Sequence, residues 1–374
     1  MNISPFKLER YFTKYEFTAA YSLCNSDCEA MTIAEVLALE EGAEEKFHQQ
    51  WLGYTQTQGH PELRQDISVI YDGTSPEDLL VCTGAQEPIF LFCEAILQAG
   101  DEVIVQTPCY QSLKSVPQSI GCKVVEWEVS YEGSIPSFDL DVLEKMVNEH
   151  TRAIFLNTPH NPTGYHFTTV EQERIIQIAR KYKVILFSDE VYRELEAEPS
   201  CRLPAMADVY EHGVSLGVMS KAYGLPGLRI GWIASRRKDL LEKVAILKEY
   251  TSMCNAAPSE FLAGVALRNR KQILARNLGI IQQNMQLYTA FFKKYTALFS
   301  WYKPIAGPIT FVNMLFSQDD AAFAKHALEK QQLLLLPGEV YDYPGFFRIG
   351  LGRKGISEAL EQFDIFLAKH VIEA

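Results

Sequence analysis

Lys221 is the residue of this chain whose surroundings point most directly to chemistry. It lies in the stretch S-K-A-Y-G-L-P-G-L-R-I-G-W at 220–232, and a second cation, Arg229, follows eight residues later. A lysine amine captures carbonyl compounds only where burial or a neighbouring cation lowers its pKa. The glycines and the proline between the two cations prevent a continuous helix and let the backbone turn back. The stretch therefore predicts a Schiff-base lysine that faces, together with Arg229, a small anionic ligand.

Composition and charge limit what kind of protein can hold this lysine. The 374 residues are 47% hydrophobic and 22% charged, as in ordinary globular proteins, and their number suggests one large and one small domain. A formal net charge of -12 argues against nonspecific binding to nucleic acid or to anionic membranes. The first ten residues contain no apolar signal core, and the longest apolar runs are too short to span a membrane.

The cysteines carry no pattern of a metal site or of a disulfide framework. They form no C-x-x-C pair and no Cys/His grouping with zinc spacing, so we expect no metal and interpret them as reduced, mostly buried thiols of a cytoplasmic protein. The eight positions are 24, 28, 82, 93, 109, 122, 201 and 254.

Short apolar strands alternate with amphipathic helices from about residue 78 onward. Nearly continuous apolar strands of this kind are typical of a mostly parallel sheet covered by helices on both faces. The sequence therefore predicts a doubly wound α/β domain, with helices over 86–98 and 170–182. The expected strands lie at 78–84, 101–108, 122–129, 152–159, 184–190 and 214–220.

The rest of the chain has a different pattern. A long helical region extends over roughly 259–295, and strand-like and helical segments without a parallel run follow it. This indicates a smaller α+β domain, which the N-terminal segment would join. We therefore place the large domain at 40–265 and the small domain at 1–39 and 266–374.

Residues that could bind a ligand through their side chains or backbone follow five of the predicted strands. In a doubly wound sheet the ligand lies beyond the carboxyl ends of the strands, so these residues should meet in one crevice. They are Gly84, Ala85 and Gln86; Pro108 and Tyr110; the run N-T-P-H-N-P-T-G at 157–164; Asp189 and Tyr192; and Ser220 and Lys221.

Four motifs in a fixed order give the chain a family resemblance. They are N-T-P-H-N-P-T-G at 157–164, D-E-V-Y at 189–192, S-K-x7-R at 220–229 and R-I-G-L-G at 348–352. N-P-T-G alone would be weak evidence, but the combination is specific. The chain resembles the fold-type I, pyridoxal-phosphate-dependent enzymes of the class I/II aminotransferase family, and the resemblance extends from Tyr54 to Arg348.

The resemblance implies a role for each residue that handles the reacting centre. Lys221 would hold pyridoxal 5'-phosphate (PLP) as a Schiff base and then move a proton at the substrate Cα. Asp189 would keep the pyridine nitrogen protonated, and Tyr192 would donate a hydrogen bond to the ring O3′ oxygen. Asn161 would bind near O3′ and the substrate carboxylate, and Tyr110 would stack on the ring.

The remaining roles implied by the resemblance concern anchoring. Arg348 would clamp the substrate α-carboxylate, and Asn157 would support its loop. Tyr54 matches a family tyrosine that reaches the phosphate in the neighbouring subunit, which implies a homodimer with shared active sites. The cofactor phosphate would be bound by the strand-end residues Gly84, Ala85 and Gln86, by Ser220 and by Arg229.

The sequence departs from the family pattern at three places. Val218 stands where a phosphate-binding Ser or Thr is usual, three residues before the lysine. The segment L-C-N-S-D-C-E at 23–29 lacks the usual glycine-proline turn, and G-P-I-T-F at 307–311 lacks a glycine pair. The last two lie where side-chain specificity is normally set, so the substrate stays open.

Three functions remain in view. The first is an aminotransferase that passes an amino group from an L-amino acid to a 2-oxo acid. The second is a PLP-dependent lyase or cyclase of the capreomycidine synthase type, in which Asp27 and Glu29 would hold the guanidinium of an arginine-derived substrate; Tyr192 speaks against it. The third is a catalytically silent binding protein with the same fold. For Asp27 and Glu29 we expect a plainer role near the dipole of a helix that a Thr32–Glu35 capping box opens.

Overall fold

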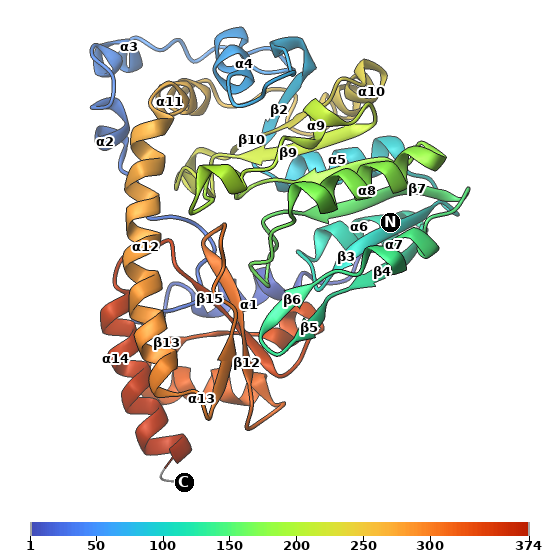
Figure 1. Cartoon of the computed structure of the whole chain (residues 1–374). Helices are drawn as coiled ribbons and strands as arrows, with labels where there is room; N and C mark the ends of the chain where they lie inside the picture. Colours follow the sequence, from blue (N-terminus) through green and yellow to red (C-terminus); the bar gives the residue numbers. More distant parts are fainter. Residues whose placement is uncertain (1, 373–374) are drawn as a thin grey trace.

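A seven-stranded sheet forms the centre of the computed structural model, which describes residues 2–372 (Figure 1). β10 is antiparallel to both of its neighbours, and every other adjacent pair is parallel. In spatial order the strands are β2 (Leu79–Thr83), β10 (Ile230–Ala234), β9 (Gly213–Val218), β8 (Ile185–Asp189), β7 (Thr151–Asn157), β3 (Glu102–Thr107) and β4 (Lys123–Glu128).

Helices cover this sheet on both faces, as expected for a doubly wound α/β fold. Neighbouring residues of one strand enter different apolar clusters: Phe155 and Phe187 pack with α5 and α10, whereas Ile154 packs with α7 and α8. Because successive side chains of a strand point to opposite faces, both faces of the sheet are covered by apolar side chains and shielded from water. The helices over the sheet are α5 (Gln86–Ile96), α6 (Ser112–Ile120), α7 (Leu140–Met146), α8 (Thr169–Tyr182), α9 (Met206–Val209) and α10 (Lys238–Lys248).

A second, four-stranded antiparallel sheet lies near the C-terminus. Figure 1 shows the long helix α12 running from the region of the first sheet down beside the second. β1 (Tyr21–Ser22) pairs in parallel with β13 (Leu333–Leu334), so the N-terminal segment contacts the C-terminal part of the chain. The elements here are α11 (Ala257–Arg268), α12 (Arg270–Lys294), β11 (Phe299–Trp301), β12 (Ile309–Met314), α13 (Asp320–Gln331), β14 (Leu336–Pro337), β15 (Phe346–Gly350) and α14 (Ile356–Leu367).

The domain limits at residues 39/40 and 265/266 stay a prediction. The two main sheets lie on opposite sides of the second limit, and the β1–β13 pair joins the two outer segments. The remaining elements are α1 (Lys7–Tyr15), α2 (Ile33–Leu37), α3 (Ala43–His48), α4 (Pro61–Ser68) and the hairpin of β5 (Ser130–Glu132) and β6 (Ile135–Ser137).

All six strands expected from the apolar runs are present, but β10 was not expected. It begins directly after Arg229, inside the stretch that the glycines and the proline mark as a turn. The turn expected from the glycines and the proline is present over 220–229. The predicted turn region extended too far, because β10 already begins at Ile230. Since β10 is antiparallel, its first residues lie at the same edge of the sheet as the carboxyl ends of its neighbours, which brings Arg229 back to that edge. Within residues 2–372, no helix is long and apolar enough to cross a membrane.

Replacing Thr168 should destabilise the protein measurably. Its hydroxyl accepts from the backbone N–H of Glu171 at 3.2 Å, and the Glu171 carboxylate accepts from the Thr168 N–H at 2.7 Å, so a capping box opens α8. We expect Thr168→Ala to lower the free energy of unfolding by about 1 kcal/mol. Urea denaturation measures this, with the exposed neighbour Thr169→Ala as the matched control. Equal effects of the two variants would contradict the capping role.

Candidate active site

A cavity of about 620 Å³ lies at the carboxyl edge of the large sheet. Five strand ends contribute to it, as the sequence predicts, and so does the start of β10. Of the expected residues, Gly84 lies beside the cavity behind Arg229, and the side chain of Tyr54 is 82% exposed, away from it. The expected residues that line it are Ala85, Gln86, Tyr110, Asn157, Asn161, Asp189, Tyr192, Ser220, Lys221, Arg229 and Arg348.

The Lys221 amine stands just beyond the end of β9. Its Nζ donates a hydrogen bond to the hydroxyl of Ser26 at 2.8 Å. Burial lowers the pKa of Lys221, and Arg348 lowers it further, whereas the carboxylates of Asp27 and Asp189 oppose the shift. A lysine with a lowered pKa is more often neutral, and a neutral amine is the form that attacks a carbonyl and accepts a proton. The first expectation from the sequence therefore has a physical basis in the structure.

Asp189 is a buried carboxyl group without a cationic partner at hydrogen-bonding distance. Its side chain is 5% exposed, and within residues 2–372 its carboxylate accepts from the backbone N–H of Val191 alone, at 3.3 Å. Burial raises the pKa of Asp189 to about 7, although that N–H and the Lys221 charge act in the opposite direction. A cationic N–H donor placed in the cavity would supply the missing partner.

The loop after β7 is held by its own asparagines. Asn157 donates from Nδ2 to the backbone carbonyl of Asp189 at 2.8 Å, and its Oδ1 accepts from the backbone N–H of Asn161 at 2.6 Å. This geometry is the support for the loop that the sequence predicts for Asn157. It leaves the side chain of Asn161 directed at Tyr341 and Arg348, whose donors reach its Oδ1 at 2.9 and 3.2 Å.

Arg348 is almost completely buried and is held from two sides. Its Nε and Nη2 both donate to the backbone carbonyl of Cys24, at 3.2 and 2.7 Å, and its Nη1 donates to the hydroxyl of Tyr341. Sequence reasoning missed the partners Tyr341, Cys24 and Ser26. Cys24 and Ser26 lie more than 190 residues from their contacts, within the segment L-C-N-S-D-C-E, whereas Tyr341 precedes Arg348 by seven residues and belongs to no motif recognised in the sequence.

The cradle near Arg229 needs a glycine. Gly84 has a φ of +68°, and a Cβ there would lie 2.2 Å from Nη2 of Arg229, so any side chain would displace the guanidinium. Arg229 donates to the backbone carbonyl of Pro226 and forms no ion pair within residues 2–372. Ala85 precedes the first turn of α5, whose free N–H groups suit an anion, and the buried Ser220 lines the same cavity. Val218 is apolar and buried at the same end, so it contributes no donor.

The expectation for Asp27 is wrong. Instead of lying near a helix dipole, Asp27 is buried and paired with Arg353 by two hydrogen bonds, at 2.9 and 2.7 Å. Glu29 accepts from the backbone N–H of Lys354 at 2.9 Å, so it too is engaged in the chain. The capping box of Thr32 and Glu35 is present at the start of α2 as predicted. The pairing of Asp27 spans more than 300 residues, which no local pattern indicates.

Comparison with known proteins assigns the chain that forms this cavity to a family. The model of the family described as aminotransferase class I and II matches residues 22–363, which is most of the chain. The chain belongs to this family. Its members of fold type I are PLP-dependent enzymes, and the α/β architecture with a mostly parallel sheet agrees with that fold.

Similar proteins include enzymes of two kinds. An aspartate aminotransferase of Sulfurisphaera tokodaii is 27% identical over 345 residues, which cover 87% of this chain and 83% of the relative. A capreomycidine synthase of Streptomyces vinaceus is 24% identical over 351 residues, covering 92% and 88%. The crystal structure of a PLP-dependent aminotransferase from Streptococcus suis covers 98% of both chains at 28% identity, with a TM-score of 0.92.

The residues that line the cavity fit PLP. The buried carboxyl group of Asp189 lacks the cationic N–H that a protonated pyridine ring carries, and Arg229 with the start of α5 lacks the anion that a phosphate group is. The lysine amine stands in the same cavity. The chain is thus a PLP-dependent enzyme of the aminotransferase class.

Replacing Asp189 by Asn should change how the stability of the cofactor-free protein depends on pH. The folded-state pKa of about 7 lies above the ordinary value of 3.8, so Asp189 favours folding fully below pH 3.8 and loses this contribution as the pH rises through 7. We expect the wild type to lose stability relative to Asp189→Asn between roughly pH 4 and pH 8. Denaturation of both proteins across this range, without cofactor, measures the difference; parallel curves would contradict the raised pKa.

Proposed function

We propose that this chain transfers the amino group of an L-amino acid to a 2-oxo acid, with Lys221 as the residue that binds PLP covalently. The observation that supports this most is the common cavity of Lys221 and Asp189, which lie at the ends of the neighbouring strands β9 and β8. When bound, PLP supplies an aldehyde that condenses with amines and a ring that withdraws electrons from the substrate Cα. The residues of the chain do the rest.

Lys221 would move the proton at the reacting carbon. Its lowered pKa keeps a share of the amine neutral, so that it would accept the proton from the substrate Cα and deliver it to the C4′ carbon of the cofactor. The Ser26 hydroxyl, 2.8 Å from Nζ, would hold the amine in place between these transfers. Asp189 would pair with the ring nitrogen and keep it protonated, and Tyr192 would donate a hydrogen bond to the ring oxygen.

The anchoring groups would orient both molecules. Arg229, Ser220 and the backbone N–H groups of Ala85 and Gln86 would bind the phosphate, beside Gly84, while Tyr110 would lie on the ring face. Arg348 and Asn161 would bind the substrate carboxylate. The Tyr341 hydroxyl, the Asn161 side-chain oxygen and the Cys24 carbonyl fix the planar guanidinium of Arg348, so its remaining N–H group, on Nη2, is oriented before substrate arrives.

A cyclase acting on an arginine-derived substrate is the second candidate, favoured by the capreomycidine synthase relative. It requires free acids for the substrate guanidinium. The two acids that the sequence suggests are both engaged: Asp27 pairs with the guanidinium of Arg353, and Glu29 accepts from a backbone N–H. The contacts that the sequence suggests for the cyclase are therefore not available at these two acids, and Tyr192, which lines the cavity, is the residue expected of the transaminase.

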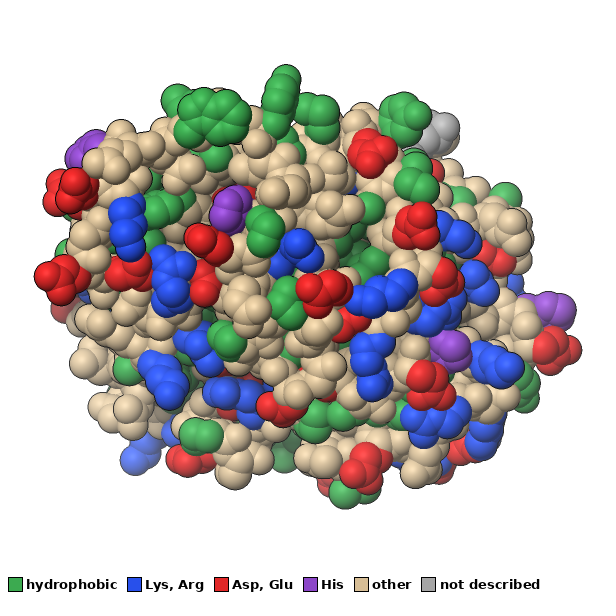
Figure 2. All heavy atoms as spheres, turned by 90° about the horizontal axis from the view of Figure 1, so that it is seen from above, with side chains coloured by type: hydrophobic (Ala, Val, Ile, Leu, Met, Phe, Trp, Pro, Cys, Tyr) green, Lys and Arg blue, Asp and Glu red, His purple; other side chains and the backbone are tan. Residues whose placement is uncertain are grey.

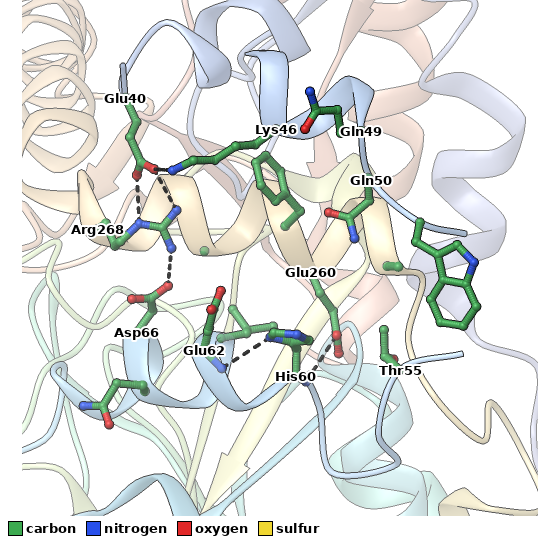
Figure 3. Close-up of a pocket in the computed structure, with 16 residues that line it drawn as sticks. Glu40, Lys46, Gln49, Gln50, Thr55, His60, Glu62, Asp66, Glu260 and Arg268 are labelled. Atoms are coloured by element: carbon green, nitrogen blue, oxygen red, sulfur yellow. Dashed lines mark hydrogen bonds and ion pairs between the residues drawn. The ribbon is translucent and has the colours of Figure 1, made fainter. Parts of the chain in front are cut away.

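We further infer a homodimer with shared active sites. A groove of about 740 Å³ lies between the α3–α4 region and α11, and Figure 3 shows Arg268 between Glu40 and Asp66 within it. Apolar side chains near this groove in the sequence are open to solvent, among them Trp51, at 77% exposed, and Tyr54, at 82%. In Figure 2 hydrophobic side chains protrude along one rim of the molecule, whereas charged side chains mix over the rest of that view.

A second copy would cover this surface and bring Tyr54 to a phosphate in the partner site, which its position outside its own cavity allows. We also infer a cytoplasmic location, because all eight cysteines are free thiols and six of them are buried, which suits a reducing compartment.

Replacing Lys221 should abolish turnover and covalent cofactor attachment. In the wild type, borohydride treatment should fix the cofactor on the peptide that contains Lys221, and an L-amino acid should convert the cofactor to its amine form with release of one equivalent of 2-oxo acid. Lys221→Ala should do neither, whereas Lys243→Ala, which changes an exposed lysine of α10, should behave as the wild type. Release of an elimination product without the amine form would favour the cyclase.

Mixing two inactive variants tests the shared site. Lys221→Ala and Tyr54→Ala should each have little activity alone. If Tyr54 acts in the partner site, an equimolar mixture after subunit exchange should recover about a quarter of wild-type activity, because half of the dimers are mixed and each has one intact site. A mixture no more active than the mean of its components would contradict the proposal.

A further inference from the structure

Charged side chains line the cavity in equal numbers of both signs. Because the numbers are equal, each charge can be assigned to a partner of opposite sign. This assignment rests on the proposed function. The cations are Lys221, Arg229, Arg348 and Arg353, and the acids are Glu9, Glu16, Asp27 and Asp189.

Four of the eight charges are used by the reacting centre. Lys221 binds the cofactor aldehyde, Arg229 its phosphate and Asp189 its ring nitrogen. Arg348 binds the carboxylate that every α-amino acid carries. None of these four is available to distinguish one amino acid side chain from another.

Arg353 would be the only remaining cation for a substrate side-chain carboxylate, and it is already occupied. Its Nε and Nη2 donate to the two oxygens of Asp27 at 2.9 and 2.7 Å, which is the planar, two-bond geometry in which an arginine binds an acid most firmly. The side chain of Asp27 is 10% exposed and that of Arg353 37% exposed. A dicarboxylic substrate would have to displace a buried internal acid from this pair.

Glu9 and Glu16 are left without a cation. Neither forms an ion pair within the described part of the chain. Glu9 accepts from the Tyr110 hydroxyl at 3.3 Å, and Glu16 accepts from the side-chain amide of Asn25 at 3.4 Å. Both come from the N-terminal segment, Glu9 from α1 and Glu16 from the position directly after it. A substrate held by Arg348 and Lys221 would extend its side chain toward this segment.

We propose that the amino donor is a basic L-amino acid, whose side-chain ammonium or guanidinium is bound by Glu9 and Glu16. Phe6 and Phe12 line the same side of the cavity and would pack against the methylene stem. The two glutamates, of which Glu9 is exposed and Glu16 half-buried, supply carboxylate partners for such a group at the mouth of the cavity, and Tyr110 orients Glu9. Aspartate and glutamate lack a partner here.

The experiment uses the PLP-loaded enzyme and follows conversion of the cofactor to its amine form. L-lysine, L-ornithine and L-arginine are compared with L-norleucine, which has a stem of similar length and no charge, and with L-aspartate and L-glutamate. We expect kcat/KM for the best basic donor to exceed that for norleucine by about tenfold or more, because hydrogen bonds to charged groups are the strong ones. This ratio should decrease as salt is added.

Variants distinguish binding of the basic side chain by Glu9 and Glu16 from the amino-transfer reaction itself. Glu9→Gln combined with Glu16→Gln should bring the basic donors to the level of norleucine and leave norleucine itself unchanged. Asp27→Asn should free Arg353 and increase the rate with L-glutamate. Each variant retains the volume of the original side chain, so norleucine turnover reports whether the enzyme is still folded.

Two results would overturn the proposal while the aminotransferase stands: norleucine converted as fast as every basic donor, or L-glutamate preferred by the wild type. A basic preference that survives in the double glutamine variant would also overturn the assigned residues. Failure of every donor to convert the cofactor would instead contradict the proposed function and, with it, this inference.

Discussion

The active site depends on the parallel alignment of β3, β7, β8 and β9. Parallel strands that are buried on both faces end at one edge, and there the chain presents polar side chains to a common space. The apolar runs of the large sheet leave little room for chemistry, so its functional groups are the last residue of a strand, as Asn157 and Asp189 are, or follow a strand by two to four residues. The antiparallel β10 adds its beginning to the same edge, which is why Arg229 lies near Lys221 although a turn separates them.

Burial of charge is the second constraint on this cavity. Arg348 is nearly inaccessible and is stabilised by a carbonyl and a hydroxyl rather than by an acid, whereas Asp189 has little more than a backbone N–H. A buried ion with an incomplete set of partners costs free energy unless a ligand completes it. The cavity is therefore arranged for a bound molecule that carries both signs of charge, as a protonated pyridine ring with a phosphate and an amino acid carboxylate does.

Much of the large domain was predictable because its strands and site residues are encoded by short, continuous stretches of sequence. Each strand is a continuous apolar run, and the residues of the reacting centre stand directly after these runs in motifs such as D-E-V-Y. Contacts between the two ends of the chain were not predictable. Ser26 on Lys221, Cys24 on Arg348 and Asp27 on Arg353 each join segments that are more than 190 residues apart, and no periodicity or turn signal encodes such a pair. β10 was missed for another reason, since glycine-rich sequence hid a short buried strand.

The pairing of β1 with β13 has a consequence for how the enzyme is made. Residues 21–22 emerge from the ribosome early, yet their partners at 333–334 follow some three hundred residues later. The large sheet needs only residues before 235, so it is able to assemble while synthesis continues. The N-terminal segment, which lines one part of the active-site cavity, cannot pair with β13 until translation is nearly finished. During that interval the nascent enzyme has its lysine but lacks the surface that selects a substrate.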